Sequence, residues 1–207
     1  MCMKNEEIVE VLEKIRGIKF KDNVVTPVSI SEIPELEDMG SYEDIINELE
    51  RGRLSFNLPN HLIHDTYSLI SSKRHKRLNN FTLQFPFLFT LIMVVYGLFI
   101  GNYWLLTLIP VLLVSQVSSS VFGGKLLYGI LLLVVIYFFY NLNYTLGIVF
   151  STILISIYFS HQVRNQRRKY LMKLSLFNEE LFCFIFFSRS LTITDNRSGK
   201  NIYSGMN

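Results

Sequence analysis

The feature that most constrains the fold is an 80-residue stretch, from Phe81 to Ser160, whose only charged residue is Lys125. The flanking regions are very different. Residues 1–80 contain 11 Lys or Arg and 14 Asp or Glu, and residues 161–207 contain 8 and 3. A water-soluble domain needs charged side chains to cover its surface. The sequence therefore predicts that this stretch is embedded in lipid, and that the chain is an integral membrane protein.

Short polar or glycine-containing breaks divide the stretch into four apolar segments. These segments run 81–100, 103–122, 126–140 and 144–160. A helix needs about 20 apolar residues to cross a hydrocarbon core of about 30 Å, and the breaks are long enough only for tight turns. The predicted fold class is an all-α membrane protein with four transmembrane or membrane-embedded helices in two hairpins. The last two segments are short, so the second hairpin either spans fully or enters as a wedge.

Basic residues cluster at both borders of the apolar stretch, and we call these two clusters the basic collars. They consist of Lys73, Arg74, Lys76 and Arg77 before the stretch, and Arg164, Arg167, Arg168, Lys169 and Lys173 after it. Lys and Arg near membrane ends stay on the cytoplasmic side, where anionic lipid headgroups attract them. Both termini are therefore expected in the cytosol, and the breaks at 101–102 and 141–143 are expected outside.

Residues 1–80 are predicted to form a cytosolic region with amphipathic helices and some extended chain. Ile8, Val11, Leu12 and Ile15 have helical spacing, and Gly17 follows as a stop signal. Residues 18–30 are rich in Val, Ile and Thr and are expected to be extended. A capping box at 41–44 predicts a second helix, and a third is expected to begin at 59–60 and continue into the membrane.

Residues 161–207 are predicted to form a cytosolic tail that is first basic and then apolar. The basic part is expected to lie as a helix along the headgroups. The apolar run Leu181–Phe187 is too short to cross a bilayer, so it is either interfacial or buried. Alternation at 191–194, followed by a turn-like sequence, predicts a small hairpin that ends near Tyr203.

One compact group of possible metal ligands occurs outside the apolar stretch. His61, His64 and Asp65 are spaced i, i+3 and i+4, so they would share one helix face and could supply two or three ligands. A solvated helix side has the same spacing, and this second interpretation is the one we favour. Accordingly, we expect no metal and no cofactor.

The polar residues within the apolar segments are uncharged. The candidates for lining a pore or for packing between helices are Ser115, Gln116, Ser119, Ser151 and Ser156. Small hydroxylated residues allow close helix packing, which we favour over a pore. The absence of ionisable residues within the segments argues against a coupled ion pump or an intramembrane protease. No phosphate-binding glycine loop, GxSxG or HExxH motif is present, so the protein is not expected to be an enzyme.

Three short motifs follow the order seen in the PRA1 family of prenylated Rab acceptors, which includes the Yip3-like proteins. They are Arg77-Leu-Asn-Asn-Phe81 before the first hairpin, Phe122-Gly-Gly-Lys125 at the link, and Ser160-His-Gln-Val-Arg164 at the exit. The chain resembles that family over about residues 73–173. It lacks the family's aromatic-rich amino-terminal motif and the Asn-Tyr that commonly starts the first hairpin. The resemblance implies a non-enzymatic membrane protein of the early secretory pathway that either engages lipidated small GTPases or shapes and sorts membrane.

These observations favour a non-enzymatic, multi-pass membrane adaptor that engages small GTPases or vesicle-trafficking partners. The alternatives are a small oligomeric channel or membrane-disrupting effector, as in bacterial defence, and an accessory subunit of a membrane complex. Expected partners are anionic lipid headgroups, a second copy or another membrane protein, and a lipidated small GTPase, but not nucleic acid. The location is the ER/Golgi endomembrane if the resemblance holds, and otherwise the bacterial inner membrane.

Overall fold

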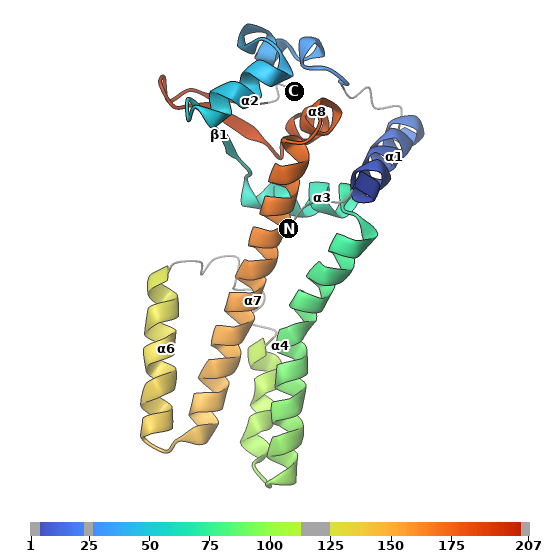
Figure 1. Cartoon of the computed structure of the whole chain (residues 1–207). Helices are drawn as coiled ribbons and strands as arrows, with labels where there is room; N and C mark the ends of the chain where they lie inside the picture. The colour runs from blue at the N-terminus through green and yellow to red at the C-terminus, as the bar shows by residue number, and fades with distance from the viewer. Residues whose placement is uncertain (1–4, 23–26, 113–124, 204–207) are drawn as a thin grey trace. The chain divides into compact units, whose positions relative to one another are not determined.

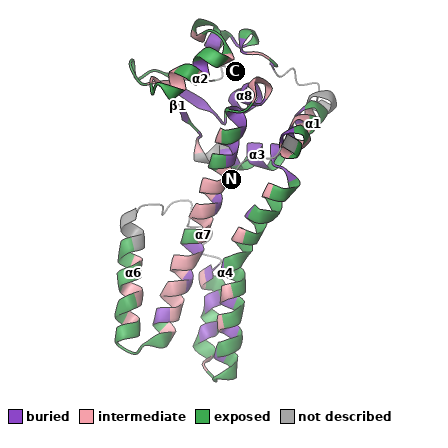
Figure 2. Cartoon of the chain, in the orientation of Figure 1, coloured by how far each residue is buried: buried purple, intermediate pink, exposed green. Residues whose placement is uncertain are grey.

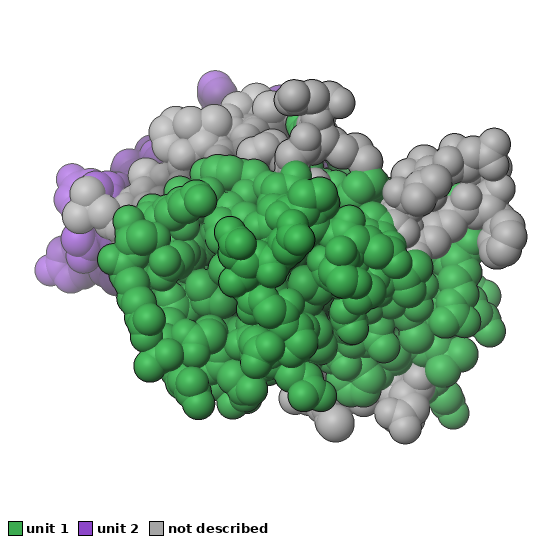
Figure 3. Space-filling model, turned by 90° about the horizontal axis from the view of Figure 1, so that it is seen from above, with its two compact units in different colours: residues 1–76, 166–207 green, residues 77–165 purple. Residues whose placement is uncertain are grey.

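The computed structural model describes residues 5–22, 27–112 and 125–203, with the backbone alone for residues 5, 19–22, 60–62 and 125–128. The chain divides into two compact units (Figure 3). Unit 1 comprises residues 1–76 and 166–207, and unit 2 comprises residues 77–165. The expected boundaries at 80 and 161 thus lie close to those of the units. The carboxy-terminal tail, however, is not a separate part, because it folds together with the amino-terminal region.

Unit 1 is built from short helices and a small sheet (Figure 1). Its helices are α1 (Asn5–Asp22), η1 (Ile30–Glu32), η2 (Pro34–Met39), α2 (Tyr42–Glu50), α3 (Asn60–Ile70) and α8 (Glu179–Phe187), together with the basic ends of α4 (Lys73–Phe99) and α7 (Tyr144–Ser175). The predicted stop at Gly17 is wrong, because α1 continues to Asp22. A glycine ends a helix when it adopts a left-handed conformation, and Gly17 does not adopt one.

The second and third predicted helices are present. At α2, the Ser41 backbone N–H donates to the Asp44 carboxylate at 2.9 Å, and the Asp44 N–H donates to the Ser41 hydroxyl, so the capping box is confirmed. Helix α3 begins after Pro59, as expected. It does not continue into α4, because Ser71 is extended (φ −65°, ψ 138°) and the Ser72 hydroxyl accepts from the His75 N–H at the start of the new helix.

The sheet joins the two ends of the chain. Strands β1 (Leu54–Asn57), β2 (Thr192–Asp195) and β3 (Asn201–Ile202) are antiparallel in the order β1-β2-β3. The β2–β3 hairpin agrees with the expected hairpin. The sequence pattern does not predict β1, because four residues between two turns are too few to establish an alternation. Its pairing with β2 depends on residues almost 140 positions away.

Helix α8 lies in the core of unit 1. All residues from Leu181 to Phe186 are buried (Figure 2). Of the two expected placements of this apolar run, interfacial or buried, the structure shows the buried one. The Phe182 ring contacts the rings of Tyr42, Phe56 and Phe186, with centroids 5.7–6.1 Å apart. Val11 and Ile15 of α1 are fully buried in the same cluster. A core of this kind can stabilise a small domain without lipid.

Unit 2 contains the apolar parts of α4 and α7, η3 (Tyr103–Thr107), which continues as a helix to Leu112, and α6 (Lys125–Tyr140). Helix α6 agrees with the segment predicted at 126–140. Helix α4 begins at Lys73, before the apolar segment predicted at 81–100, and α7 continues beyond the segment predicted at 144–160 and ends at Ser175. Lys and Arg favour helices, so each apolar helix extends through its collar. The basic part of the tail is thus a continuation of α7 rather than a separate helix.

Two helices, α4 and α7, are long and apolar enough to cross a membrane. Many apolar side chains of α4 are exposed, including Leu91 (60%), Ile92 (62%) and Phe99 (91%). Such exposure is costly in water but favourable in lipid. The fold is therefore mostly helical with a small sheet and two candidate spans. Insertion of four helices stays a prediction.

Candidate functional site: the basic collars

The first collar occupies the start of α4 and the second occupies the later part of α7. All four side chains of the first collar are exposed. In the second, Arg168, Lys169 and Lys173 are exposed, whereas Arg164 and Arg167 are half-buried. Lys and Arg in a helix project charged heads on long apolar stems, which suits them to a water–lipid boundary.

Within unit 1, a cluster of four residues links the two collar helices, and we call it the junction cluster. It consists of Tyr67, Ser72, His75 and Tyr170. The His75 ring of α4 stacks on the Tyr170 ring of α7, with centroids 4.1 Å apart. The buried Ser72 backbone N–H donates to the Tyr170 hydroxyl at 3.0 Å, and the Tyr67 hydroxyl lies 2.8 Å from His75 Nδ1. These contacts hold the basic ends of α4 and α7 in one fixed arrangement.

Two arginines of the second collar also contact other residues of unit 1. The Arg167 guanidinium lies 5.2 Å from the centroid of the Tyr67 ring, as a cation–π contact. Burial raises the pKa of Tyr67 to about 12, although the nearby guanidinium acts in the opposite direction. Arg168 Nη2 donates to Asn57 Oδ1 at 3.0 Å. The second collar is therefore partly structural.

Helix α1 supports the amino end of α4. The Glu10 carboxylate accepts from the Lys73 backbone N–H at 3.1 Å and pairs with the Lys14 ammonium at 2.9 Å. The hydrogen bond from Lys14 is the largest of the effects that lower the pKa of Glu10. Lys14 Nζ also donates to the Ser71 carbonyl at 2.6 Å. A carboxylate at a helix amino terminus satisfies an otherwise open N–H and complements the helix dipole.

The possible metal ligands His64 and Asp65 lie on α3, where both side chains are largely exposed. His64 Nδ1 is 3.5 Å from Asp65 Oδ1. The side chain of His61 lies outside the described residues. Among the described side chains, no three of His, Cys, Asp or Glu group closely enough to hold a metal ion.

Only two of the five candidate pore or packing residues, Ser151 and Ser156, lie within the described residues. Ser115, Gln116 and Ser119 lie outside the described residues. The Ser151 hydroxyl donates to the Gly147 carbonyl of its own helix at 2.8 Å. The Ser156 side chain is fully buried within unit 2. The choice between helix packing and a pore stays a prediction for these residues.

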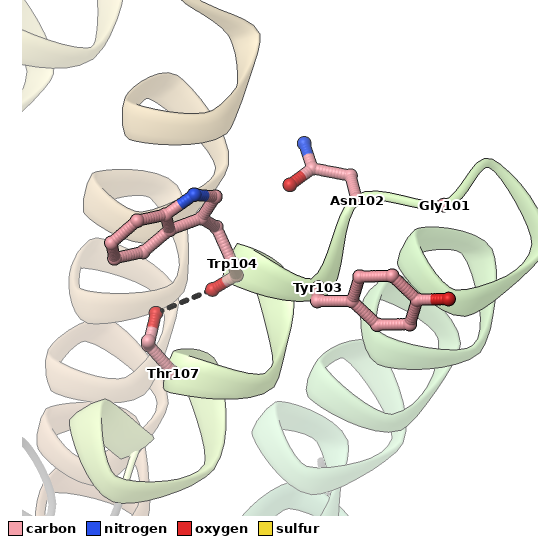
Figure 4. Close-up of a pocket in the computed structure, with 5 residues that line it drawn as sticks. All are labelled: Gly101, Asn102, Tyr103, Trp104 and Thr107. Atoms are coloured by element: carbon pink, nitrogen blue, oxygen red, sulfur yellow. Dashed lines mark hydrogen bonds between the residues drawn. The ribbon is translucent and has the colours of Figure 1, made fainter.

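Unit 2 contains a second feature, two pockets beside its turns, which we call the turn pockets. Figure 4 shows the smaller of the two. One pocket of about 320 Å³ is lined by Gly101, Asn102, Tyr103, Trp104 and Thr107. The other, of about 470 Å³, lies between the turn at 101–102 and the turn at 141–143. Asn102 lines both pockets, and its Nδ2 donates to Thr145 Oγ1 at 2.8 Å, which joins the two turns.

Sequence reasoning identified the collars but not the junction cluster or the turn pockets. Tyr67 and His75 stand eight residues apart on two helices, and Tyr170 lies 95 residues beyond His75. A basic cluster that also contains a histidine and is preceded by two serines, Ser71 and Ser72, is a weak signal of such a site. Only the folded unit shows that α4 and α7 meet there.

No protein-family model, curated protein or solved structure matches the chain.

Proposed function

We propose that this protein is a non-enzymatic, multi-pass membrane adaptor. In this proposal unit 2 lies in the bilayer, and unit 1 is a cytosolic module held at an anionic leaflet by the basic collars. The observation that carries the proposal is the set of exposed Lys and Arg side chains at the basic ends of two long apolar helices. Each such residue near an anionic surface contributes about 1 kcal/mol.

The lipid part of the proposal is tested with the full chain in nanodiscs of phosphatidylcholine, with or without phosphatidylglycerol. Hydrogen exchange of residues 73–77 and 164–173 should slow when the anionic lipid is present, and added salt should reverse the effect. The variant K73Q/R74Q/K76Q/R77Q should lose this response at the first collar. The control R51Q/R189Q/R197Q/K200Q removes the same number of charges outside the collars and should keep it. Equal behaviour of the two variants would contradict the proposal.

The adaptor part of the proposal rests on the resemblance to prenylated Rab acceptors, and the proposed protein partner is a prenylated small GTPase. Nanodisc-embedded chain should capture the prenylated GTPase in preference to the same GTPase without its lipid. Empty nanodiscs measure simple lipid partitioning. Capture no greater than on empty nanodiscs would reject a GTPase adaptor.

The alternative of a pore has a separate test. The hydroxyl bonding of Ser151 and the burial of Ser156 support helix packing. We therefore expect dye-loaded liposomes that contain the protein to remain sealed. Leakage that depends on protein concentration would favour the channel interpretation.

A further inference from the structure

The turn pockets differ from the collars in their chemistry, because no residue that lines either pocket is charged at neutral pH. The lining is made of amides, hydroxyls and aromatic rings beside aliphatic side chains. Both volumes, about 320 and 470 Å³, fall in the range of small-molecule sites. A phosphate or carboxylate ligand would have no cationic partner here. An uncharged ligand would leave no unpaired charge.

The amides of the two turns offer complementary hydrogen-bonding groups. Asn102 uses its NH₂ to donate to Thr145 Oγ1, so its carbonyl oxygen is the group that can accept from a ligand. Asn143 uses its carbonyl oxygen to accept from the Leu146 N–H at 3.3 Å, so its NH₂ is the group that can donate. A hydroxyl both donates and accepts. One acceptor and one donor in the same pocket therefore suit a ligand with several hydroxyls.

Aromatic residues supply a flat apolar surface in the smaller pocket, which shares Asn102 with the larger one. Trp104 is 75% exposed and Tyr103 is 68% exposed, although both line the smaller pocket (Figure 4). The Thr107 hydroxyl donates to the Trp104 carbonyl at 2.7 Å, which fixes the turn that carries the ring. A hexose has hydroxyls at its edge and C–H groups on its faces, and these faces pack well on aromatic rings. A sterol, by contrast, has one hydroxyl and would leave most of the amide groups unused.

We propose that the turn pockets bind the uncharged hexose headgroup of a membrane glycolipid. The lipid is preferred over a free sugar because exposed apolar side chains adjoin the pockets. Ile100 and Leu142 line the larger pocket with 51% and 70% exposure, so acyl chains would have an apolar surface beside the headgroup. This inference rests on the proposed placement of unit 2 in the bilayer.

The chain carries its own reporter, since Trp104 is its single tryptophan. The full chain is reconstituted in phosphatidylcholine nanodiscs with increasing fractions of a monohexosyl diacylglycerol, and Trp104 emission is recorded. We expect a saturable blue shift. Asn102→Ala and, independently, Asn143→Ala should weaken the apparent affinity about three- to tenfold, as loss of one hydrogen bond predicts. Tyr140→Ala, an aromatic residue 85% exposed and outside both pockets, should leave it unchanged.

Several outcomes would overturn the inference. These are the absence of a shift, an equal shift with phosphatidylglycerol, an equal loss in the Tyr140→Ala variant, or an equal response to free methyl hexoside without glycolipid. Co-elution of the protein with nanodiscs is measured first on the same samples. Failure to co-elute would reject the proposed membrane placement, whereas co-elution without a glycolipid response rejects the pocket assignment alone.

Discussion

Tyr170 is the single residue on which the junction cluster most depends. Its hydroxyl accepts from the buried N–H of Ser72, and its ring stacks on His75. Tyr170→Phe keeps the ring but leaves that N–H without its partner, which costs about 1–3 kcal/mol. We predict that the free energy of unfolding falls by that amount, which circular dichroism in micelles detects as a lower unfolding midpoint. The control Tyr203→Phe, at an exposed position, should change nothing, and an unaltered midpoint in Tyr170→Phe would contradict the role of the cluster.

Two other buried tyrosines make the stability of unit 1 depend on pH in the alkaline range. Burial raises the pKa of both Tyr42 and Tyr67 from 10 to about 12. The unfolded chain therefore loses these protons first, so their contribution to stability is complete below pH 10 and is lost as pH rises toward 12. The free energy of unfolding should decline over that interval, and less steeply in Tyr42→Phe. If the free energy of unfolding of Tyr42→Phe declined with pH as steeply as that of the natural chain, the raised pKa of Tyr42 would be contradicted.

At the scale of elements, the contact between α4 and η3 depends on one glycine. A Cβ at Gly97 would lie 2.7 Å from Leu105 Cβ and 3.0 Å from the Asn102 carbonyl oxygen. Gly97→Ala should therefore separate the two elements and lower stability by about 1–3 kcal/mol, measured by denaturant titration in mixed micelles. Gly129→Ala is the matched control, because α6 has open space there and alanine favours a helix by about 0.5–1 kcal/mol. Equal effects would contradict close packing at Gly97.

The elements that the sequence predicted well are those with local causes. The capping box at Ser41, the start of α6 near Leu126 and the start of α7 at Tyr144 depend on neighbouring residues. The sequence also predicted the collars, because a cluster of Lys and Arg next to an apolar stretch can be recognised from the order of residues alone. Strand β1 and the Tyr67–His75–Tyr170 contacts depend on partners far along the chain, and local patterns do not contain that information.

At the scale of the whole molecule, the amino-terminal and carboxy-terminal regions of the chain pack together within unit 1. The β1–β2 pairing, the packing of α8 and the bond from Ser29 Oγ to Glu179 Oε1 at 2.8 Å all join the two ends. Loss of the last strands should therefore unfold the amino-terminal region as well. Truncation after Ser190 should raise protease sensitivity at residues 5–70, and unchanged resistance there would contradict a shared core.

The central claim is that unit 2 lies in a membrane as two hairpins, with both collars on the cytosolic side. Accessibility of single cysteines placed at Asn102, Lys125 and Asn143, with Cys2 and Cys183 replaced by serine, tests it most directly. A membrane-impermeant thiol reagent should label positions 102 and 143 from outside, and position 125 only after the membrane is opened. Labelling of position 125 from outside, or protection of position 102 or 143, would contradict the account.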